Sequence, residues 1–242
     1  MIYRKFFKRL IDIVLSLFGL IILSPVFLII AIAIKINSPG PILFKQKRVG
    51  IHKNTFYILK YRTMKIDTPK DTPTHLLENP EQYISKVGKF LRKTSLDELP
   101  QIINILTGKM SVIGPRPALW NQYDLIEERD MYGANDVRPG LTGWAQVNGR
   151  DELPIPVKAM FDGEYVQKMN FVFDCKCFFM TIFKVLKSDG VVEGTHNSPA
   201  PIEVNENTYK EAENVNENIA YEEPNIIVTY KETENVKELI EK

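Results

Sequence analysis

The sequence has few of the residues that common functional sites require. It contains two cysteines, Cys175 and Cys177, and three scattered histidines, which argues against a disulfide scaffold and against a histidine-rich metal site. On a helix, side chains two residues apart point in different directions, so packing is the favoured interpretation of the cysteine pair. No Gly-x-Gly-x-x-Gly occurs, and the Gly-Lys at 108–109 lacks the other residues of a phosphate-binding P-loop. Asp-x-Asp, a pattern of many metal-dependent sugar-nucleotide transferases, is also missing.

The chain also lacks a large net charge, because 31 basic and 30 acidic residues among its 242 leave +1. That balance hides a partition. Residues 1–65 contain twelve basic residues and a single acid, Asp12. Residues 1–195 have 27 basic and 19 acidic residues, a net charge of +8, whereas residues 196–242 have four lysines and eleven glutamates, a net charge of −7. The sequence therefore predicts a cationic body with an acidic tail.

The tail contains a short internal repeat. Residues 208–215 (TYKEAENV) recur as residues 229–236 (TYKETENV), 21 positions later. Two copies are too few for a self-supporting repeat fold. With its composition rich in Glu and Asn, the segment 196–242 is expected to be disordered or weakly helical.

One long run has no charge at all. Residues 13–34 are uncharged, and as a straight helix they would span roughly 33 Å, enough to cross a bilayer. Three interpretations compete: a cleaved signal peptide, a single transmembrane helix and a re-entrant hairpin. A signal peptide is the least favoured, because its apolar region is expected to be about 7–15 residues long.

The flanks and the middle of this run favour the hairpin. Basic residues flank both ends, and since such residues stay on the cytoplasmic side, a crossing would send one group outward. Pro25 removes a helix hydrogen bond in mid-run and clashes with the carbonyl of Ile21. Ser24 can donate its hydroxyl to a freed backbone carbonyl. The hairpin break is thus predicted at Ser24 and Pro25, with a proline kink in an ordinary spanning helix as the alternative.

Beyond the hairpin, the pattern predicts an α+β domain. Strands are expected at 42–46 and 55–61, a loop at 66–80, helices at 84–92, 101–106 and around 120–130, and a loop with short strands at 137–151. Residues 174–187 predict an amphipathic helix with lysines on one face. Such a helix either packs on a core or lies in a membrane interface.

An adjacent pair of carboxylates, Asp97 and Glu98, is the strongest candidate for chemistry. A structural alternative exists, because Ser95 followed three residues later by Glu98 is a capping-box pattern at the start of a helix. Carboxylates, a metal ion and fixed arginines are the parts needed to handle a diphosphate. The cationic residues near the pair in sequence or in motif-like turns are Lys60, Arg62, Arg92, Arg116, Arg138 and Arg150.

Five segments in register resemble one family. They are the Lys-Arg-x-x-Asp start at 8–12 with its Ser-Pro break, and residues 59–64 (LKYRTM), 95–101 (SLDELPQ), 114–117 (GPRP) and 137–150 (VRPGLTGWAQVNGR). In order and spacing they resemble the bacterial sugar transferases that are monotopic polyprenyl-phosphate phosphoglycosyl transferases. The likeness is to the small type, similar to the undecaprenyl-phosphate bacillosamine-phosphate transferase, and it covers about residues 1–195.

The resemblance implies three regions and a location. Residues 1–36 would form a re-entrant membrane helix. Residues 37–195 would form a cytoplasmic catalytic domain with short strands and amphipathic interfacial helices, and residues 196–242 an added acidic tail. The protein would be monotopic, on the cytoplasmic face of the bacterial inner membrane.

The implied activity is transfer of a sugar-1-phosphate from a UDP-sugar to undecaprenyl phosphate, with release of UMP. This would be the first membrane step in assembling a glycoconjugate such as capsule, exopolysaccharide, O-antigen or a glycoprotein glycan. Asp97 would be the nucleophile that forms a covalent aspartyl phospho-sugar in a ping-pong mechanism. Glu98 would hold Mg²⁺. An N-acetylated or diacetamido hexose is the first expectation for the sugar.

The basic residues would bind the two substrates. Lys60 and Arg150 match positions that contact phosphate in the family, and Arg92 matches one that receives the polyprenyl phosphate. The other members of the expected phosphate-binding set are Arg62, Arg116 and Arg138. Arg116 and Arg138 lie in turns that contain prolines, so these two arginines can equally be structural.

The expected partners are the UDP-sugar, undecaprenyl phosphate and the cytoplasmic leaflet, with a homo-oligomer or downstream glycosyltransferases as further candidates and no nucleic acid. A hypothesis from another class is a non-catalytic scaffold that is anchored in the membrane and binds anionic lipid. In that scaffold, Asp97 and Glu98 would only cap a helix.

Overall fold

The computed structural model describes residues 2–66, 68, 80–149 and 153–187. The chain divides into two units, Met1–Ala200 and Pro201–Lys242, and the described residues all belong to the first. The acidic tail with its repeat, and Arg150, lie outside the described residues.

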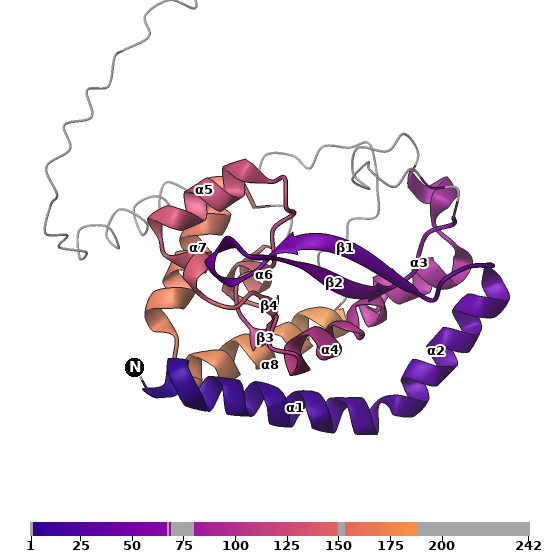
Figure 1. Ribbon diagram of the computed structural model, residues 1–242, viewed down its shortest axis with the longest axis horizontal. Coiled ribbons are helices and arrows are strands. Elements are labelled where there is room, and N and C mark those ends of the chain that lie inside the picture. Colours follow the sequence, from indigo (N-terminus) through magenta and orange to yellow (C-terminus); the bar gives the residue numbers. More distant parts are fainter. Residues whose placement is uncertain (1, 67, 69–79, 150–152, 188–242) are drawn as a thin grey trace, which may run out of the picture. The chain divides into compact units, whose positions relative to one another are not determined.

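Helices and short strands are mixed along this unit, which confirms the α+β prediction (Figure 1). The helices are α1 (Lys8–Ile22), α2 (Ser24–Asn37), α3 (Lys86–Lys93), α4 (Gln101–Leu106), α5 (Tyr123–Met131), α6 (Trp144–Asn148), α7 (Ile155–Lys168) and α8 (Phe171–Lys187). The strands are β1 (Leu43–Val49), β2 (Thr55–Tyr61), β3 (Ser111–Ile113) and β4 (Gly140–Thr142).

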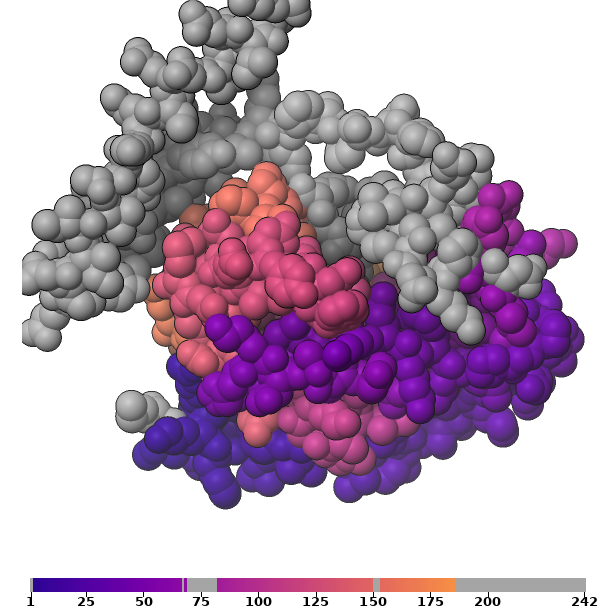
Figure 2. Space-filling view, turned by 45° about the horizontal axis from the view of Figure 1, so that its top comes forward, coloured from indigo at the N-terminus to yellow at the C-terminus, as the bar shows by residue number. Residues whose placement is uncertain are grey.

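The strands form two separate pairs. β1 and β2 make an antiparallel hairpin in which Lys60 lies opposite Phe44, and β3 pairs with β4 in parallel. Figure 2 shows the hairpin, in purple, at the surface between the indigo N-terminal helices and the pink segment that contains α5. The hairpin therefore links the N-terminal helices to the rest of the unit.

The two N-terminal helices meet at a sharp bend. Within the described ranges, no single helix is both long and apolar enough to cross a membrane. The segments Tyr3–Ile22 and Ser24–Asn37, bent by 61° where they meet, pass that test as a pair. The Ser24 hydroxyl donates a hydrogen bond to the Ile21 carbonyl at 2.8 Å, the bond that Pro25 cannot make because it has no N–H.

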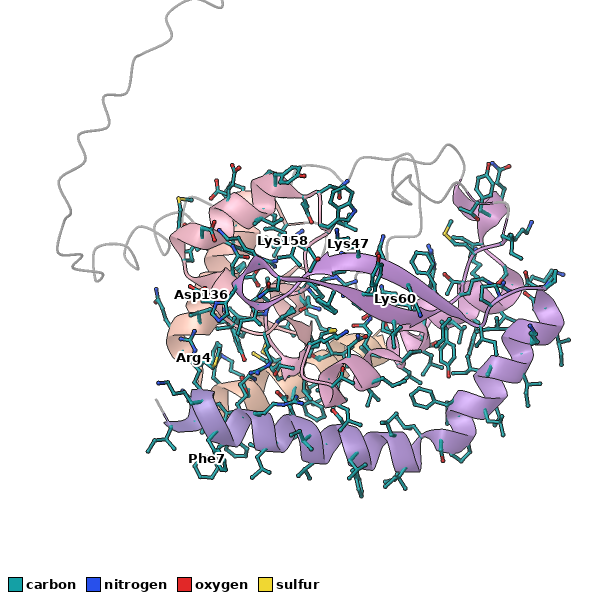
Figure 3. The ribbon with its side chains drawn as sticks, in the orientation of Figure 1. Arg4, Phe7, Lys47, Lys60, Asp136 and Lys158 are labelled. Atoms are coloured by element: carbon teal, nitrogen blue, oxygen red, sulfur yellow. The ribbon has the colours of Figure 1, made fainter. Side chains whose placement is uncertain are left out.

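The buried face of α1 is polar and its exposed face is apolar. Lys8, Asp12 and Ser16, spaced one turn apart, are its buried residues. The Asp12 carboxylate accepts hydrogen bonds from the Ser111 hydroxyl at 3.0 Å and the Val112 N–H at 2.9 Å. This polarity is the reverse of a surface helix in a water-soluble protein. The exposed apolar side chains of α1 and the turn before it include Phe7, which points away from the sheet in Figure 3, and Leu10, Val14, Leu17, Phe18 and Ile21.

Helix α8 also turns many apolar side chains outward, and its buried Asp174 is bonded to the start of α1. The carboxylate of Asp174 accepts hydrogen bonds from Lys8 Nζ and the Tyr3 hydroxyl, both at 2.6 Å, and from the Tyr165 hydroxyl at 2.8 Å. Cys177 is buried beside Ile113, which confirms the packing interpretation for this cysteine. The exposed apolar side chains of α8 are Phe171, Val172, Phe178, Phe179, Ile182, Phe183 and Val185.

Two helices depart from the sequence-based expectation. The prediction of a loop with short strands over 137–151 is wrong for α6, because five residues are too few to display a helical period. Helix α7 has no counterpart in the prediction, because its buried residues include Asp162 and two small ones, Ala159 and Gly163, in place of an apolar stripe. By contrast, β2 and α4 begin and end where the sequence predicts.

A buried ion pair joins α5 to α7. Arg129 donates from Nε, at 2.8 Å, and from Nη2 to the same carboxylate oxygen of Asp162. The two side chains are only 4% and 1% exposed. Removing one member of such a pair leaves the other charge buried without compensation.

We expect Asp162→Ala to lower the free energy of unfolding by about 3–5 kcal/mol. In detergent-solubilised protein this corresponds to a fall in melting temperature of roughly 10 °C. The control is Lys168→Ala, which breaks an exposed pair with Glu164 and is expected to cost about 0.5 kcal/mol or less. Equal melting temperatures for the two variants would contradict this role of the buried pair.

Candidate active site

The two carboxylates predicted to carry chemistry lie in a short 3₁₀ turn, Leu96–Glu98, between α3 and α4. The residue before it, Ser95, has a left-handed backbone (φ 56°, ψ 16°), which is uncommon for a residue other than glycine. A capping residue needs an extended backbone and a bond from its side chain to the helix, and Ser95 makes no such bond. The capping-box alternative is therefore wrong.

Glu98 is held by two cations. Its Oε1 accepts hydrogen bonds from Lys60 Nζ at 2.8 Å and from Arg116 Nη2 at 3.1 Å. Lys60 lies near the end of β2, within the hairpin where Figure 3 labels it, and Arg116 lies in the Gly114–Pro117 turn. Burial raises the pKa of Glu98, but the charges of Arg116 and Lys60 outweigh burial and hold this pKa well below its usual range. Glu98 is therefore ionised at neutral pH and holds two cations in place.

Asp97, its neighbour in the chain, is in a different electrostatic state. Among the residues that the structure describes, none donates a hydrogen bond or forms an ion pair to its carboxylate. Burial raises the pKa of Asp97, and the nearby charges of Lys60, Arg92 and Arg116 only partly offset this effect. Two adjacent carboxylates whose environments move their pKa values in opposite directions are typical of a catalytic pair.

A third cation acts on Asp97 from α3. Arg92 donates from Nε to the hydroxyl of Thr63 at 3.0 Å, and its charge lowers the pKa of Asp97. Thr63 is not among the predicted site residues, although it lies within the 59–64 motif. Together the five charged residues form what we call the charged cluster, which consists of Lys60, Arg92, Asp97, Glu98 and Arg116.

Two predicted phosphate ligands are engaged elsewhere. Arg62 donates to the carbonyls of Ser38 and Pro39, at 2.7 and 2.8 Å, at the end of α2. Because β2 ends at Tyr61, strand alternation no longer places Arg62 on the same side as Lys60. Arg138 donates from Nε to the carbonyl of Gly108 at 3.0 Å, beyond the far end of α4. Neither residue joins the charged cluster.

The donor set bears on the expected Mg²⁺. In the described segments no group of three or more His, Cys, Asp or Glu side chains could hold a metal ion. The cluster offers only Asp97 and Glu98, and one oxygen of Glu98 already binds two cations. Mg²⁺ is usually bound by one or two carboxylates together with substrate phosphates. These residues therefore fit an Mg²⁺ ion that is shared with a diphosphate, and do not form a cage for the ion alone.

Comparison with known proteins identifies the family. The bacterial sugar transferase family matches residues 3–188. The chain is 44% identical over 189 residues to the UDP-glucose:undecaprenyl-phosphate glucose-1-phosphate transferase of Escherichia coli, an alignment that covers 75% of this chain and 40% of that relative. It is 37% identical to the uncharacterized sugar transferase EpsL of Bacillus subtilis, over 78% of this chain and 92% of that relative. The chain belongs to the bacterial sugar transferase family.

Other relatives are associated with exopolysaccharides. The exopolysaccharide production protein ExoY of Sinorhizobium fredii is 34% identical, over 76% of this chain and 87% of that protein. The chain spans about 40% of the length of the Escherichia coli relative, and more than four fifths of EpsL and ExoY. The match contains every residue of the charged cluster.

Lys60→Met is expected to raise the pKa of both Asp97 and Glu98, because the Lys60 ammonium lowers both in the native site. Protonation of the two carboxyl groups should then occur at higher pH than in the native protein. The shift can be followed by infrared difference spectroscopy of the protonated carboxyl band as pH is lowered. The control, Lys47→Met, removes an exposed ammonium that lies over the Trp120 ring and should leave this titration unchanged; an unchanged titration in Lys60→Met would refute the assignment.

Proposed function

We propose that this chain is a phosphoglycosyl transferase, which moves a sugar-1-phosphate from a UDP-sugar to undecaprenyl phosphate and releases UMP. The observation that carries the proposal is the contrast between Glu98, anchored by two cations, and Asp97, a more basic carboxylate without a bonded partner in the described chain. The name of the Escherichia coli relative states a transfer of glucose-1-phosphate between UDP-glucose and undecaprenyl phosphate. The ExoY relatives support a role in exopolysaccharide assembly.

In the first step, a carboxylate oxygen of Asp97 attacks the phosphorus that carries the sugar. A new bond forms between Asp97 and phosphorus while the bond from that phosphorus to the UMP oxygen breaks, and UMP leaves with the electron pair. Asp97 suits this role because a raised pKa makes a carboxylate more nucleophilic. It also has no ion pair within the described residues that must break before attack.

In the second step, an oxygen of undecaprenyl phosphate attacks the same phosphorus. The bond between Asp97 and phosphorus breaks, the carboxylate is restored, and the sugar phosphate is now linked to the lipid through a diphosphate. Arg92 receives the incoming phosphate, since its charge already acts at Asp97. UMP leaves before the acceptor reacts, so the kinetics are ping-pong.

The remaining members of the charged cluster bind the diphosphate. Lys60 and Arg116 lie on one oxygen of Glu98, so two positive charges are fixed before the substrate arrives. We propose that Glu98 and the substrate diphosphate together hold Mg²⁺. When bound, that ion neutralises charge on the diphosphate and on departing UMP.

We infer that the protein is monotopic on the cytoplasmic face of the bacterial membrane. Helices α1 and α8 turn apolar side chains outward and buried polar groups inward, which suits contact with hydrocarbon rather than water. The bend at Ser24 lets the pair α1 and α2 return to the side from which it enters. Each of the basic residues in 1–65 that reaches the surface adds about 1 kcal/mol of attraction to anionic lipid.

The proposal is tested by UMP release. Purified full-length protein is incubated with Mg²⁺, undecaprenyl phosphate and one UDP-sugar at a time, with UDP-glucose first because of the relatives' names and UDP-N-acetylhexoses after it. Release that requires both the acceptor and one of the sugars supports a transferase. Folded, membrane-bound protein that releases no UMP with any sugar would support the scaffold hypothesis instead.

Asp97→Asn should reduce turnover at least about 10³-fold, because an amide cannot form the covalent phospho-sugar. Association with vesicles should be unchanged, since Asp97 is far in sequence from the N-terminal helices. The matched control is Asp124→Asn in α5, where the carboxylate is exposed and turnover should equal that of the native protein. Near-native turnover of Asp97→Asn would exclude Asp97 as the nucleophile.

The topology predicts that both ends of the helix pair lie on one side of the membrane. In a background that lacks Cys175 and Cys177, single cysteines are placed at the exposed positions Arg4 and Asn37. Both should react with a membrane-impermeant maleimide only when the reagent is given access to the cytoplasmic face of the membrane. A control cysteine at Asp124 should behave in the same way. Labelling of the two positions from opposite sides would show a transmembrane crossing.

A further inference from the structure

Thr63 connects the end of the β1–β2 hairpin to α3 by two hydrogen bonds. The residue is buried, with 7% of its surface exposed. Its carbonyl accepts a hydrogen bond from the N–H of Ser85, the residue before α3, at 2.9 Å. Its hydroxyl oxygen accepts the bond from Arg92 Nε, in the last turn of α3, at 3.0 Å. One residue thus contacts both ends of the helix.

The middle of α3 also contacts Thr63, because the residue at that point of the helix is Gly88. A Cβ atom placed on Gly88 would lie 2.0 Å from the Thr63 carbonyl oxygen, so no other residue fits without displacing the helix. The Ser85 hydroxyl accepts the Gly88 N–H at 2.9 Å and caps α3 in this position. Gly88 and Arg92 are four residues apart and therefore share one helix face. The contact at Gly88 brings Arg92 over Thr63.

We propose that Thr63 is a positioning residue for the acceptor phosphate. Its hydroxyl orients the Arg92 guanidinium so that the remaining N–H groups of Arg92 face the phosphate of the polyprenyl substrate. A guanidinium carries its donors in a fixed planar fork, so a bond to Nε determines the direction of the other N–H groups. The inference rests on the proposed function, in which Arg92 receives this phosphate. Thr63 itself contacts no reacting atom.

The test compares two variants of Thr63. Thr63→Val keeps the shape of the side chain and removes the hydroxyl, and kcat/KM for undecaprenyl phosphate should fall about tenfold, as expected for loss of a bond to a charged group. In ping-pong kinetics each kcat/KM reports its own half-reaction, so kcat/KM for the UDP-sugar should change less than about twofold. Thr63→Ser keeps the hydroxyl and should restore the acceptor value to within about twofold of native.

A double-mutant cycle shows whether Thr63 acts through Arg92. In an Arg92→Ala background, Thr63→Val should cause no further loss in kcat/KM for the acceptor. The matched control is Thr107→Val, an exposed threonine whose hydroxyl bonds to the Ile103 carbonyl, and both kcat/KM values should stay native. Thermal unfolding of each variant checks the fold, and Thr63→Ala is the second hydroxyl-free variant if Thr63→Val does not fold.

The positioning role would be overturned by native kinetics in both hydroxyl-free variants, by failure of Thr63→Ser to restore the acceptor value, or by a full additional loss in the Arg92→Ala background. An equal loss for both substrates would also overturn it, because the role assigned to Arg92 concerns the acceptor. A native protein that releases no UMP refutes the proposed function itself. An active native protein with unaffected Thr63 variants refutes only the positioning role.

Discussion

Four consecutive residues at the end of the β1–β2 hairpin hold the N-terminal helix pair and the charged cluster in a fixed relation. The inner two, Tyr61 and Arg62, donate to backbone carbonyls of α2 and of the turn that follows it. The outer two, Lys60 and Thr63, bond to side chains of the charged cluster. A shift of α2 therefore moves the cluster as well. In the proposed function the acceptor phosphate lies at a fixed depth in a membrane, and this connection would set the height of the reacting groups.

The distribution of polarity explains how a basic protein presents an apolar face. Helix α1 turns Lys8 and Asp12 inward, where each is paired with a group from a distant part of the chain. The charged residues at the start of the chain are thus of two kinds, those hydrogen-bonded within the fold and those exposed at the surface. The uncharged run at 13–34 shows only where the apolar segment lies. It does not show that the helix begins before this run and includes two buried ionisable residues, Lys8 and Asp12.

The sequence predicts local features well and side-chain partners poorly. Lys60, Arg92 and Arg116 lie close enough to act on Asp97 or Glu98, a proximity that follows from the fold and that no sequence pattern shows. The other arginines show the limit, since a guanidinium satisfies backbone carbonyls as readily as phosphates and the sequence pattern is the same in both cases. Helix α7 escapes prediction because an ion pair and small residues replace the apolar stripe. The left-handed backbone of Ser95 could not be predicted, since glycine, the residue that usually indicates this conformation, is absent there.

The bond between Lys8 and Asp174 joins residues 166 positions apart. At ribosomal speeds of about 5–20 residues per second, Asp174 is made on the order of ten seconds after Lys8. The first helix therefore exists before Asp174 does, and Lys8 must find other solvation during that interval. Synthesis of α8 then closes the fold by neutralising this charge. The last helix made among the described residues, α8, thus supplies the partner of a buried charge in the first, α1.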